Sequence, residues 1–179
     1  MRKSVLFACI LALAMTAIAA NAQQQINFAD LPLIAASAPL PGGYGGLNWG
    51  NFFYVDPSLD SSSGPGFLNL LTHRDVAFIG GEFCAPVRSG CYGIISSQSG
   101  PTAFEAVSAI MAAGYQANVI TITAYNNGKY IGQMSYSLST VAQSVAFPSS
   151  WGPITELQIQ TDEPGDVVLL DLSVYYLGG

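Results

Sequence analysis

The chain has 179 residues, of which half are hydrophobic and 9% are charged, and its formal net charge is −6 at pH 7. Nucleic-acid binding requires a basic surface and anionic lipid headgroups would repel an acidic one, so we exclude both kinds of partner. Beyond the first 22 residues, no apolar run reaches the ~18 residues that a membrane-spanning helix needs, so we expect no membrane insertion.

The first 22 residues have the features of a secretory signal peptide. Arg2 and Lys3 precede an apolar run from Val5 to Ala19, and the segment Ala20-Asn21-Ala22 has the small-residue pattern of a cleavage site. We therefore predict a signal peptide over 1–22 and one secreted, extracellular domain over 23–179, which is an ordinary size for a single domain. We expect this domain to be a monomer.

Short strands separated by turn-forming residues are predicted in the first half of this domain. The predicted strand-like pieces cover 23–28, 44–49, 51–55 and 76–79. The Ala- and Pro-rich segment 33–41 should be irregular, and 56–66 (DPSLDSSSGPG) should be a loop. The segment 67–71 could form a short strand or a turn.

Two cysteines remain after the signal peptide, Cys84 and Cys91. Six residues rich in Pro, Ser and Gly separate them. In an oxidising compartment this spacing favours a disulfide that closes a small loop. Two free thiols or a metal site are the alternatives, but no third soft ligand is near in the sequence.

The second half of the domain has the clearest strand signals. Segment 118–125 (NVITITAY) alternates apolar and polar residues, and Asn126-Asn127-Gly128 separates it from 129–138, which predicts a β-hairpin. Segment 103–113 could be a strand or a helix, and we favour a strand because its neighbours are strands. Further strands are predicted over 143–147, 154–161 and 167–177, so the whole pattern indicates a sandwich or a barrel.

Several motifs resemble those of a group of secreted bacterial and fungal domains, mostly uncharacterised, that are similar to galactose-binding-like domains and carbohydrate-binding modules. The motifs are Phe28–Leu31, Pro41–Phe52, Ile120–Tyr125, Phe147–Trp151 and Leu169–Tyr175. The resemblance implies an all-β fold, a jelly-roll-like antiparallel β-sandwich. It implies little about function, because jelly rolls carry out many functions.

Two aspartates form a candidate metal site. Asp171 interrupts a strongly apolar final strand, and Asp30 follows the first strand. The first and last strands of jelly rolls often lie side by side, and calcium prefers carboxylate and carbonyl oxygens. A structural calcium is common in sandwiches of the kind that the chain resembles, although no cofactor is required by the sequence. The alternative is that each aspartate hydrogen-bonds to local backbone.

Aromatic residues are the candidate ligand-binding groups. The segment 40–57 combines five glycines with five aromatic residues, a mixture that suits either a strand entering a core or a sugar-stacking surface. We single out Tyr44, Trp49, Tyr92 and Trp151 as candidate stacking residues. We expect Trp49 to be buried, and Trp151 to be either a plug over one end of the sandwich or an exposed platform.

The first functional hypothesis is a secreted, non-catalytic domain that binds carbohydrate or another cell-surface ligand through loops over 56–66, 84–91 and around Trp151. A structural or effector-type protein with a protein partner is the second. The third is a small glycosidase that uses two of Glu82, Glu105 and Glu156. The single histidine, His73, is interpreted as a loop residue, and no nucleophile motif accompanies it.

Overall fold

A computed structural model describes residues 22–59, 64–69, 75–79, 92–98, 102–161 and 167–177. Residues 1–21 of the predicted signal peptide, the Cys84–Cys91 disulfide, His73 and Glu82 lie outside the described residues. Within the residues that the structure describes, no helix is long and apolar enough to cross a membrane.

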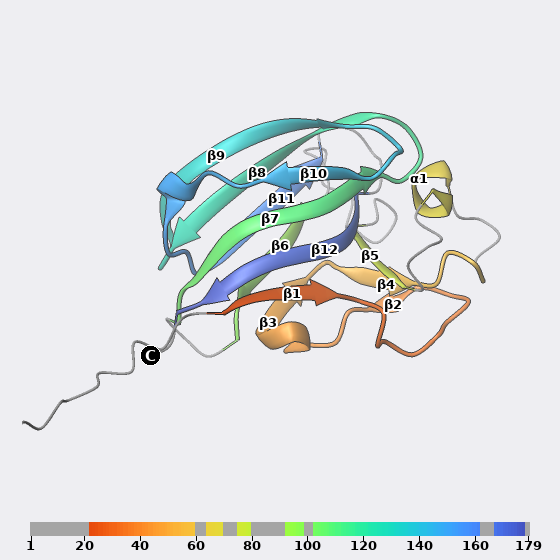
Figure 1. Ribbon diagram of the computed structural model, residues 1–179, viewed down its shortest axis with the longest axis horizontal. Helices are drawn as coiled ribbons and strands as arrows, with labels where there is room; N and C mark the ends of the chain where they lie inside the picture. Colours follow the sequence, from red (N-terminus) through yellow and green to blue (C-terminus); the bar gives the residue numbers. More distant parts are fainter. Residues whose placement is uncertain are drawn as a thin grey trace, which may run out of the picture.

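Nearly all of the described elements are strands (Figure 1). The elements are β1 (Gln23–Asn27), β2 (Ala38–Pro39), the 3₁₀ helix η1 (Tyr44–Gly46), β3 (Leu47–Gly50), β4 (Phe53–Val55), α1 (Pro65–Leu68), β5 (Val76–Ile79), β6 (Tyr92–Ser97), β7 (Phe104–Ala113), β8 (Asn118–Asn126), β9 (Lys129–Leu138), β10 (Gln143–Ala146), the 3₁₀ helix η2 (Ser149–Trp151), β11 (Glu156–Thr161) and β12 (Val167–Tyr176).

The strands form two antiparallel sheets that pack face to face (Figure 1). One sheet has the order β10-β7-β12-β5-β4-β2, with β1 also paired to β12, and we call it the seven-stranded sheet. The other has the order β3-β6-β11-β8-β9, and we call it the five-stranded sheet. This arrangement confirms the predicted all-β antiparallel sandwich. It also confirms that the first and last strands are neighbours, with Asn27 opposite Asp171.

Local turn chemistry explains the most regular part of the fold. The hairpin of β8 and β9 turns at Asn127 and Gly128, whose φ angles are 50° and 74°. Asn and Gly tolerate this left-handed region better than other residues, which is why the sequence predicts the hairpin. The segment predicted as either strand or helix is the strand β7, paired on both sides in the seven-stranded sheet.

Apolar side chains from both sheets fill the space between them. Trp49 lies in this core with 8% of its surface exposed, as expected. It makes edge-to-face contacts with Phe28 and Phe52, with ring centroids 5.7 and 5.2 Å apart. Trp49 and Phe52 of the aromatic segment 40–57 are therefore core residues.

The predicted inner face of β12 is partly wrong. The period-two rule predicts an inner face of Val168, Leu170, Leu172 and Val174. Leu172 and Val174 do lie in the main core, but Val168 and Leu170 belong to a second apolar cluster together with Phe67 of α1. The register shifts between Leu169 and Asp171, and such a β-bulge changes which side chains face the core.

The helix α1 also differs from the prediction, which placed a loop over 56–66 and a strand or turn over 67–71. Pro65 occupies the start of this helix, where a proline needs no backbone donor. Phe67 is buried and packs edge-to-face on Phe78 of β5, with centroids 5.4 Å apart. One turn of helix is enough to cover the outer apolar cluster of the seven-stranded sheet.

Candidate functional site

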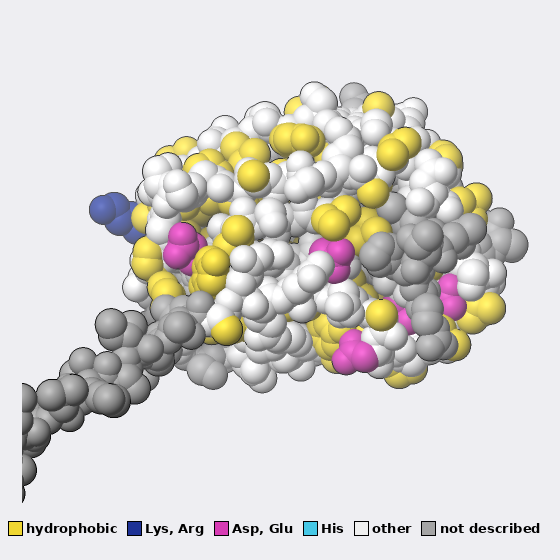
Figure 2. All heavy atoms as spheres, viewed as in Figure 1, with side chains coloured by type: hydrophobic (Ala, Val, Ile, Leu, Met, Phe, Trp, Pro, Cys, Tyr) yellow, Lys and Arg dark blue, Asp and Glu magenta, His cyan; other side chains and the backbone are white. Residues whose placement is uncertain are grey.

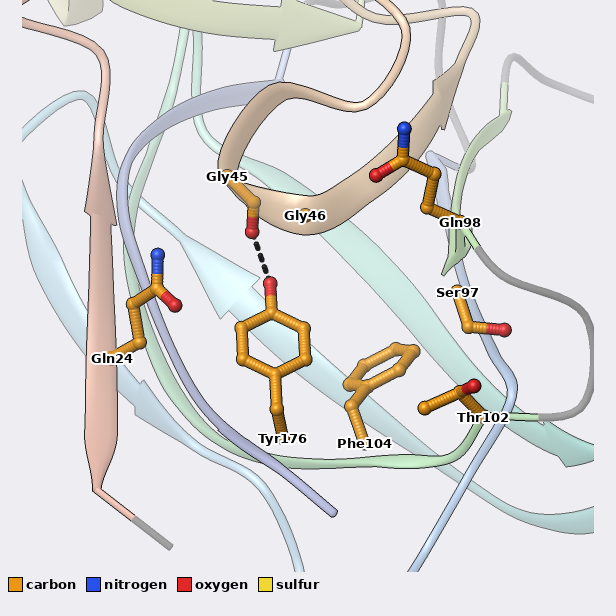
Figure 3. Close-up of a pocket in the computed structure, with 8 residues that line it drawn as sticks. All are labelled: Gln24, Gly45, Gly46, Ser97, Gln98, Thr102, Phe104 and Tyr176. Atoms are coloured by element: carbon orange, nitrogen blue, oxygen red, sulfur yellow. Dashed lines mark hydrogen bonds between the residues drawn. The ribbon is translucent and has the colours of Figure 1, made fainter. Parts of the chain in front are cut away.

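A cavity of about 370 Å³ opens at one end of the sandwich (Figure 3). The start of β1, the turn η1, the end of β6, the start of β7 and the end of β12 meet there. We call it the Tyr176 cavity. Its lining residues are Gln24, Gly45, Gly46, Ser97, Gln98, Thr102, Phe104 and Tyr176.

Tyr176 stands in the middle of this cavity. Figure 3 shows its ring between Gln24 on one side and Phe104 on the other. Its hydroxyl donates a hydrogen bond to the carbonyl oxygen of Gly45. Burial raises the pKa of the Tyr176 phenol above its usual value. A phenol is protonated at neutral pH even without such a shift, so the hydroxyl is a hydrogen-bond donor there.

The glycines of segment 43–46 shape one wall. Gly43, Gly45 and Gly46 have φ angles of 81°, 58° and 79°, which L side chains rarely adopt. A Cβ at Gly43 would lie 2.4 Å from Nε2 of Gln98, and one at Gly46 would lie 3.2 Å from the Tyr176 hydroxyl. The strand predicted over 44–49 therefore begins only at Leu47, because the glycines form the turn η1 instead.

All of the described residues that line the Tyr176 cavity are uncharged. The amides of Gln24 and Gln98 can each donate and accept hydrogen bonds, and so can the hydroxyls of Ser97 and Thr102. Tyr176 adds an aromatic ring. Such a cavity can hold a small ligand that is rich in hydroxyl groups and carries no charge.

A second cavity of about 320 Å³ adjoins the first and shares Gln24 and Gly45 with it. Tyr44 and Asp30 line this second cavity. The Tyr44 hydroxyl hydrogen-bonds with the Asp30 carboxylate and with the backbone carbonyl of Asn27. Burial, followed by the bond with Asp30, raises the pKa of Tyr44 well above its usual value. Tyr44 thus connects η1 to the end of β1 through hydrogen bonds.

A third cavity of about 240 Å³ contains two buried carboxylates. Asp75, just before β5, is 1% exposed, and Asp171 of β12 is 6% exposed. This cavity shares Gln25 and Asn27 with the second one, so the cavities follow one another along β1. The structure thus brings Asp171 close to the end of β1, as predicted, but its partner in the cavity is Asp75. Asp30 lines the neighbouring cavity.

The oxygen atoms around the third cavity are of the kinds that bind a calcium ion. Burying carboxylates is costly unless their charge is compensated, and calcium accepts carboxylate, amide and carbonyl oxygens together. Asp75 and Asp171 offer carboxylate oxygens, and Asn27 also lines the cavity. In the part of the chain that the structure describes, no three Asp, Glu, His or Cys side chains gather as metal ligands. Backbone carbonyls and water would therefore complete the coordination.

Of the four predicted stacking residues, only Tyr44 and Trp49 are brought into contact among the described residues, and none of the four lines the Tyr176 cavity. Trp49 is buried and donates a 2.8 Å hydrogen bond from Nε1 to the Tyr44 carbonyl. Tyr92 is exposed at the start of β6. Trp151 is half-buried in η2 and stacks on Phe147, with ring centroids 6.2 Å apart.

The candidate glycosidase acids are also separated. Glu105 lies on β7 of the seven-stranded sheet, between the core residues Phe104 and Ala106. Glu156 lies on β11 of the five-stranded sheet, next to the core residue Leu157. Both carboxylates therefore point away from the core on opposite outer faces, so this pair cannot act on one glycosidic bond.

No protein-family model and no curated protein sequence matches this chain. Among solved structures, it is similar to a DUF4465 family protein from Bacteroides caccae, with a TM-score of 0.57, 8% identity, and coverage of 88% of this chain and 93% of that chain. This similarity confirms the predicted fold class and, at such low identity, establishes the fold alone.

Two weaker structural matches have TM-scores below 0.5. The K2 cleaved adhesin domain of Lys-gingipain aligns with a TM-score of 0.45 and 9% identity, over 87% of this chain and 100% of that chain. The family 32 carbohydrate-binding module from C. perfringens NanJ, solved with galactose, aligns with a TM-score of 0.39 and 13% identity, over 77% of this chain and 99% of that chain.

Proposed function

We propose that this domain is a secreted, non-catalytic binding module that holds a neutral carbohydrate in the Tyr176 cavity. The observation that carries this proposal is the lining of the cavity, which combines the amides of Gln24 and Gln98, the hydroxyls of Ser97 and Thr102 and two aromatic rings, with no charged side chain among the described residues. Its volume of about 370 Å³ lies in the range typical of small-molecule sites. Secretion rests on the predicted signal peptide.

The chemistry of the lining matches a sugar in two ways. Sugar hydroxyls both donate and accept hydrogen bonds, as do the amides of Gln24 and Gln98. The apolar face of a sugar ring packs well on an aromatic ring such as that of Tyr176. A charged ligand would find no countercharge here, and the acidic chain would repel an anion. On the face that Figure 2 shows, charged side chains are also few.

The binding prediction compares two adjacent tyrosines. Replacing Tyr176 with alanine should weaken binding of the best glycan at least tenfold, about 1.4 kcal/mol, because the ring and its bond to Gly45 are lost. Tyr175→Ala is the control, since Tyr175 points to the opposite side of β12 and hydrogen-bonds with Gln23. A glycan array with the domain over 23–179 would identify the glycan, and calorimetry would give the affinities.

Two outcomes would contradict the proposal. The first is a folded wild-type domain that retains no neutral glycan on the array. The second is a Tyr175→Ala variant that loses as much affinity as the Tyr176→Ala variant. If a Gln98→Ala variant keeps full affinity, the Gln98 amide does not contact the ligand, and the proposal then depends on the Tyr176 ring.

A structural calcium ion at the third cavity is part of the same proposal. It would bind Asp75 and Asp171 and join the end of β1, the start of β5 and the middle of β12. Removing it with a chelator should lower the melting temperature by roughly 5 °C or more, because a ligand that binds only the folded state stabilises it. Circular dichroism would measure this shift, and Asp171→Asn should abolish it.

Glu105→Gln is the control for the calcium prediction, since Glu105 lies away from the third cavity. This variant should keep the full response to chelator. A wild-type melting temperature that does not change with chelator would eliminate calcium from the proposal, and Asp75 and Asp171 would then be compensated by protein groups.

A further inference from the structure

The outer face of the five-stranded sheet carries rows of polar side chains, and each row consists of residues that lie opposite one another on neighbouring strands. In one row, Gln133 of β9, Thr123 of β8 and Gln158 of β11 lie directly opposite one another. In the next row, Ser135, Thr121 and Gln160 do the same. We call these six residues the amide–hydroxyl grid.

The grid faces away from the core. Its members on β8 and β11 alternate with Ile120, Ile122, Leu157 and Ile159, which lie in the core between the sheets. Gln133 and Ser135 on the edge strand β9 are exposed. Antiparallel pairing fixes the spacing of the side chains, with about 4.8 Å between strands. The grid is therefore a preformed array of hydrogen-bonding groups on a rigid support.

No member of the grid is charged. The nearest carboxylate along β11 is Glu156, whose Oε1 accepts a 2.7 Å hydrogen bond from Gln158. Outward sheet faces of soluble proteins ordinarily mix Lys, Arg, Asp and Glu. The grid offers amides and hydroxyls, with the Glu156 carboxylate beside it on the same face. Six uncharged hydrogen-bonding side chains are suited to a neutral partner that is itself rich in hydroxyl groups.

Tyrosines stand at two corners of the grid. Tyr92 of β6 lies opposite Gln160 and is 43% exposed. Tyr125 and Tyr130 pack edge-to-face beyond the other corner, with ring centroids 6.2 Å apart, and Tyr130 is 54% exposed. Tyr92 and Tyr130 are three strands and four residues apart, on the order of 20 Å. This span is too long for one sugar ring and suits an oligomeric chain.

We propose that the amide–hydroxyl grid is a second binding site, which takes an extended neutral polysaccharide laid across the strands from Tyr92 to Tyr130. The tyrosines stack on sugar rings near the two ends of the bound stretch, and the grid bonds to hydroxyls between them. This site shares its ligand class with the Tyr176 cavity and rests on the proposed function to that extent. It lies on a different surface and binds polymer, whereas the cavity binds a short sugar.

The test separates the two sites with two variants and two kinds of probe. The variants are the double substitution Tyr92→Ala with Tyr130→Ala, and the single substitution Tyr176→Ala. The polymer probes are galactomannan, xylan and mixed-linkage β-glucan in affinity gel electrophoresis. The short probes are trisaccharides of the same sugars in calorimetry. Tyr115→Ala is the control, because Tyr115 is exposed and lies outside both sites.

The double variant should lose at least tenfold in affinity for the retarding polysaccharide and bind the trisaccharide as the wild type does. Tyr176→Ala should show the reverse pattern. Equal melting temperatures for the double variant and the wild type would establish that folding is intact. The grid proposal is overturned if the double variant keeps full affinity for the polymer, or if no polysaccharide retards the wild type. In either case, trisaccharide binding by the wild type and by Tyr176→Ala still tests the proposed sugar site in the Tyr176 cavity.

A second copy of the chain is the competing occupant of the grid. Size-exclusion chromatography of the wild type and the double variant distinguishes it. A wild-type dimer that the double substitution dissociates would overturn the polysaccharide assignment. A monomer in both cases, together with lost polymer affinity in the double variant, is the result that the proposal requires.

Discussion

Replacing Trp49 with alanine is expected to lower the free energy of unfolding by about 3–5 kcal/mol, the usual cost of removing a large buried aromatic side chain. The cost has two parts. The indole ring fills the space between Phe28 and Phe52 in the core. Its Nε1 also satisfies the backbone carbonyl of Tyr44, which the substitution would leave without this donor. Urea unfolding followed by circular dichroism would measure the loss.

Trp151→Ala is the control for this prediction, because Trp151 is the other tryptophan of the chain. It is half-buried and packs mainly on Phe147, so its removal should cost clearly less. If Trp49→Ala unfolds at the wild-type urea midpoint, Trp49 is not a core residue. The sequence alone makes Trp49 a candidate sugar-stacking residue, and an unchanged urea midpoint would favour that role for Trp49.

A second large loss is expected from Gly93→Val. Gly93 lies on the inner side of β6, where a Cβ would be only 2.5 Å from Cε2 of Phe52 and 2.7 Å from Cδ1 of Ile79. Both neighbours are themselves buried, so neither can move aside without disturbing the core. We expect a destabilisation of about 3 kcal/mol or more, at the upper end of the range for overpacked cores.

Gly42→Ala separates this steric effect from the general effect of removing a glycine. A Cβ at Gly42 would meet nothing within 4 Å, and its φ angle is not in the left-handed region. This variant should unfold within about 0.5 kcal/mol of the wild type, as most surface substitutions do. A Gly93→Val variant as stable as Gly42→Ala would mean that the sheets are farther apart at this position than the structure places them.

The sequence predicts well those parts of the fold that depend on local chemistry. Asn127 and Gly128 indicate the hairpin of β8 and β9 because few other residues accept the backbone angles of such a turn. The alternation of apolar residues likewise predicts the inner faces of β8 and β11. Regular strands with short connections then leave a sandwich or a barrel as the architecture.

Features that depend on contacts between distant segments could not be predicted in the same way. The bulge after Leu169 is a property of the pairing between β12 and β7, and nothing in the spacing of β12 itself indicates it. The helix α1 forms because Phe67 can cover an outer cluster of the seven-stranded sheet. That cluster exists only once the sheet is assembled.

The candidate site was predictable only in part. The sequence singles out the glycine-rich segment for its aromatic residues, but in the structure its glycines shape the Tyr176 cavity while Trp49 packs in the core. Asp75 was missed, although an acid directly before the apolar strand β5 is a signal that could have revealed it. Nothing in the sequence around Tyr176 distinguishes it from an ordinary residue at the end of a strand. Only the meeting of β12 with η1 makes it the centre of a cavity.

A crystal structure of the domain with the glycan that the array identifies would test the proposed binding function most directly. We expect density for a sugar ring in the Tyr176 cavity, packed on the Tyr176 ring and hydrogen-bonded to Gln24 or Gln98. A complex in which the short sugar occupies another surface and leaves this cavity to water would contradict it.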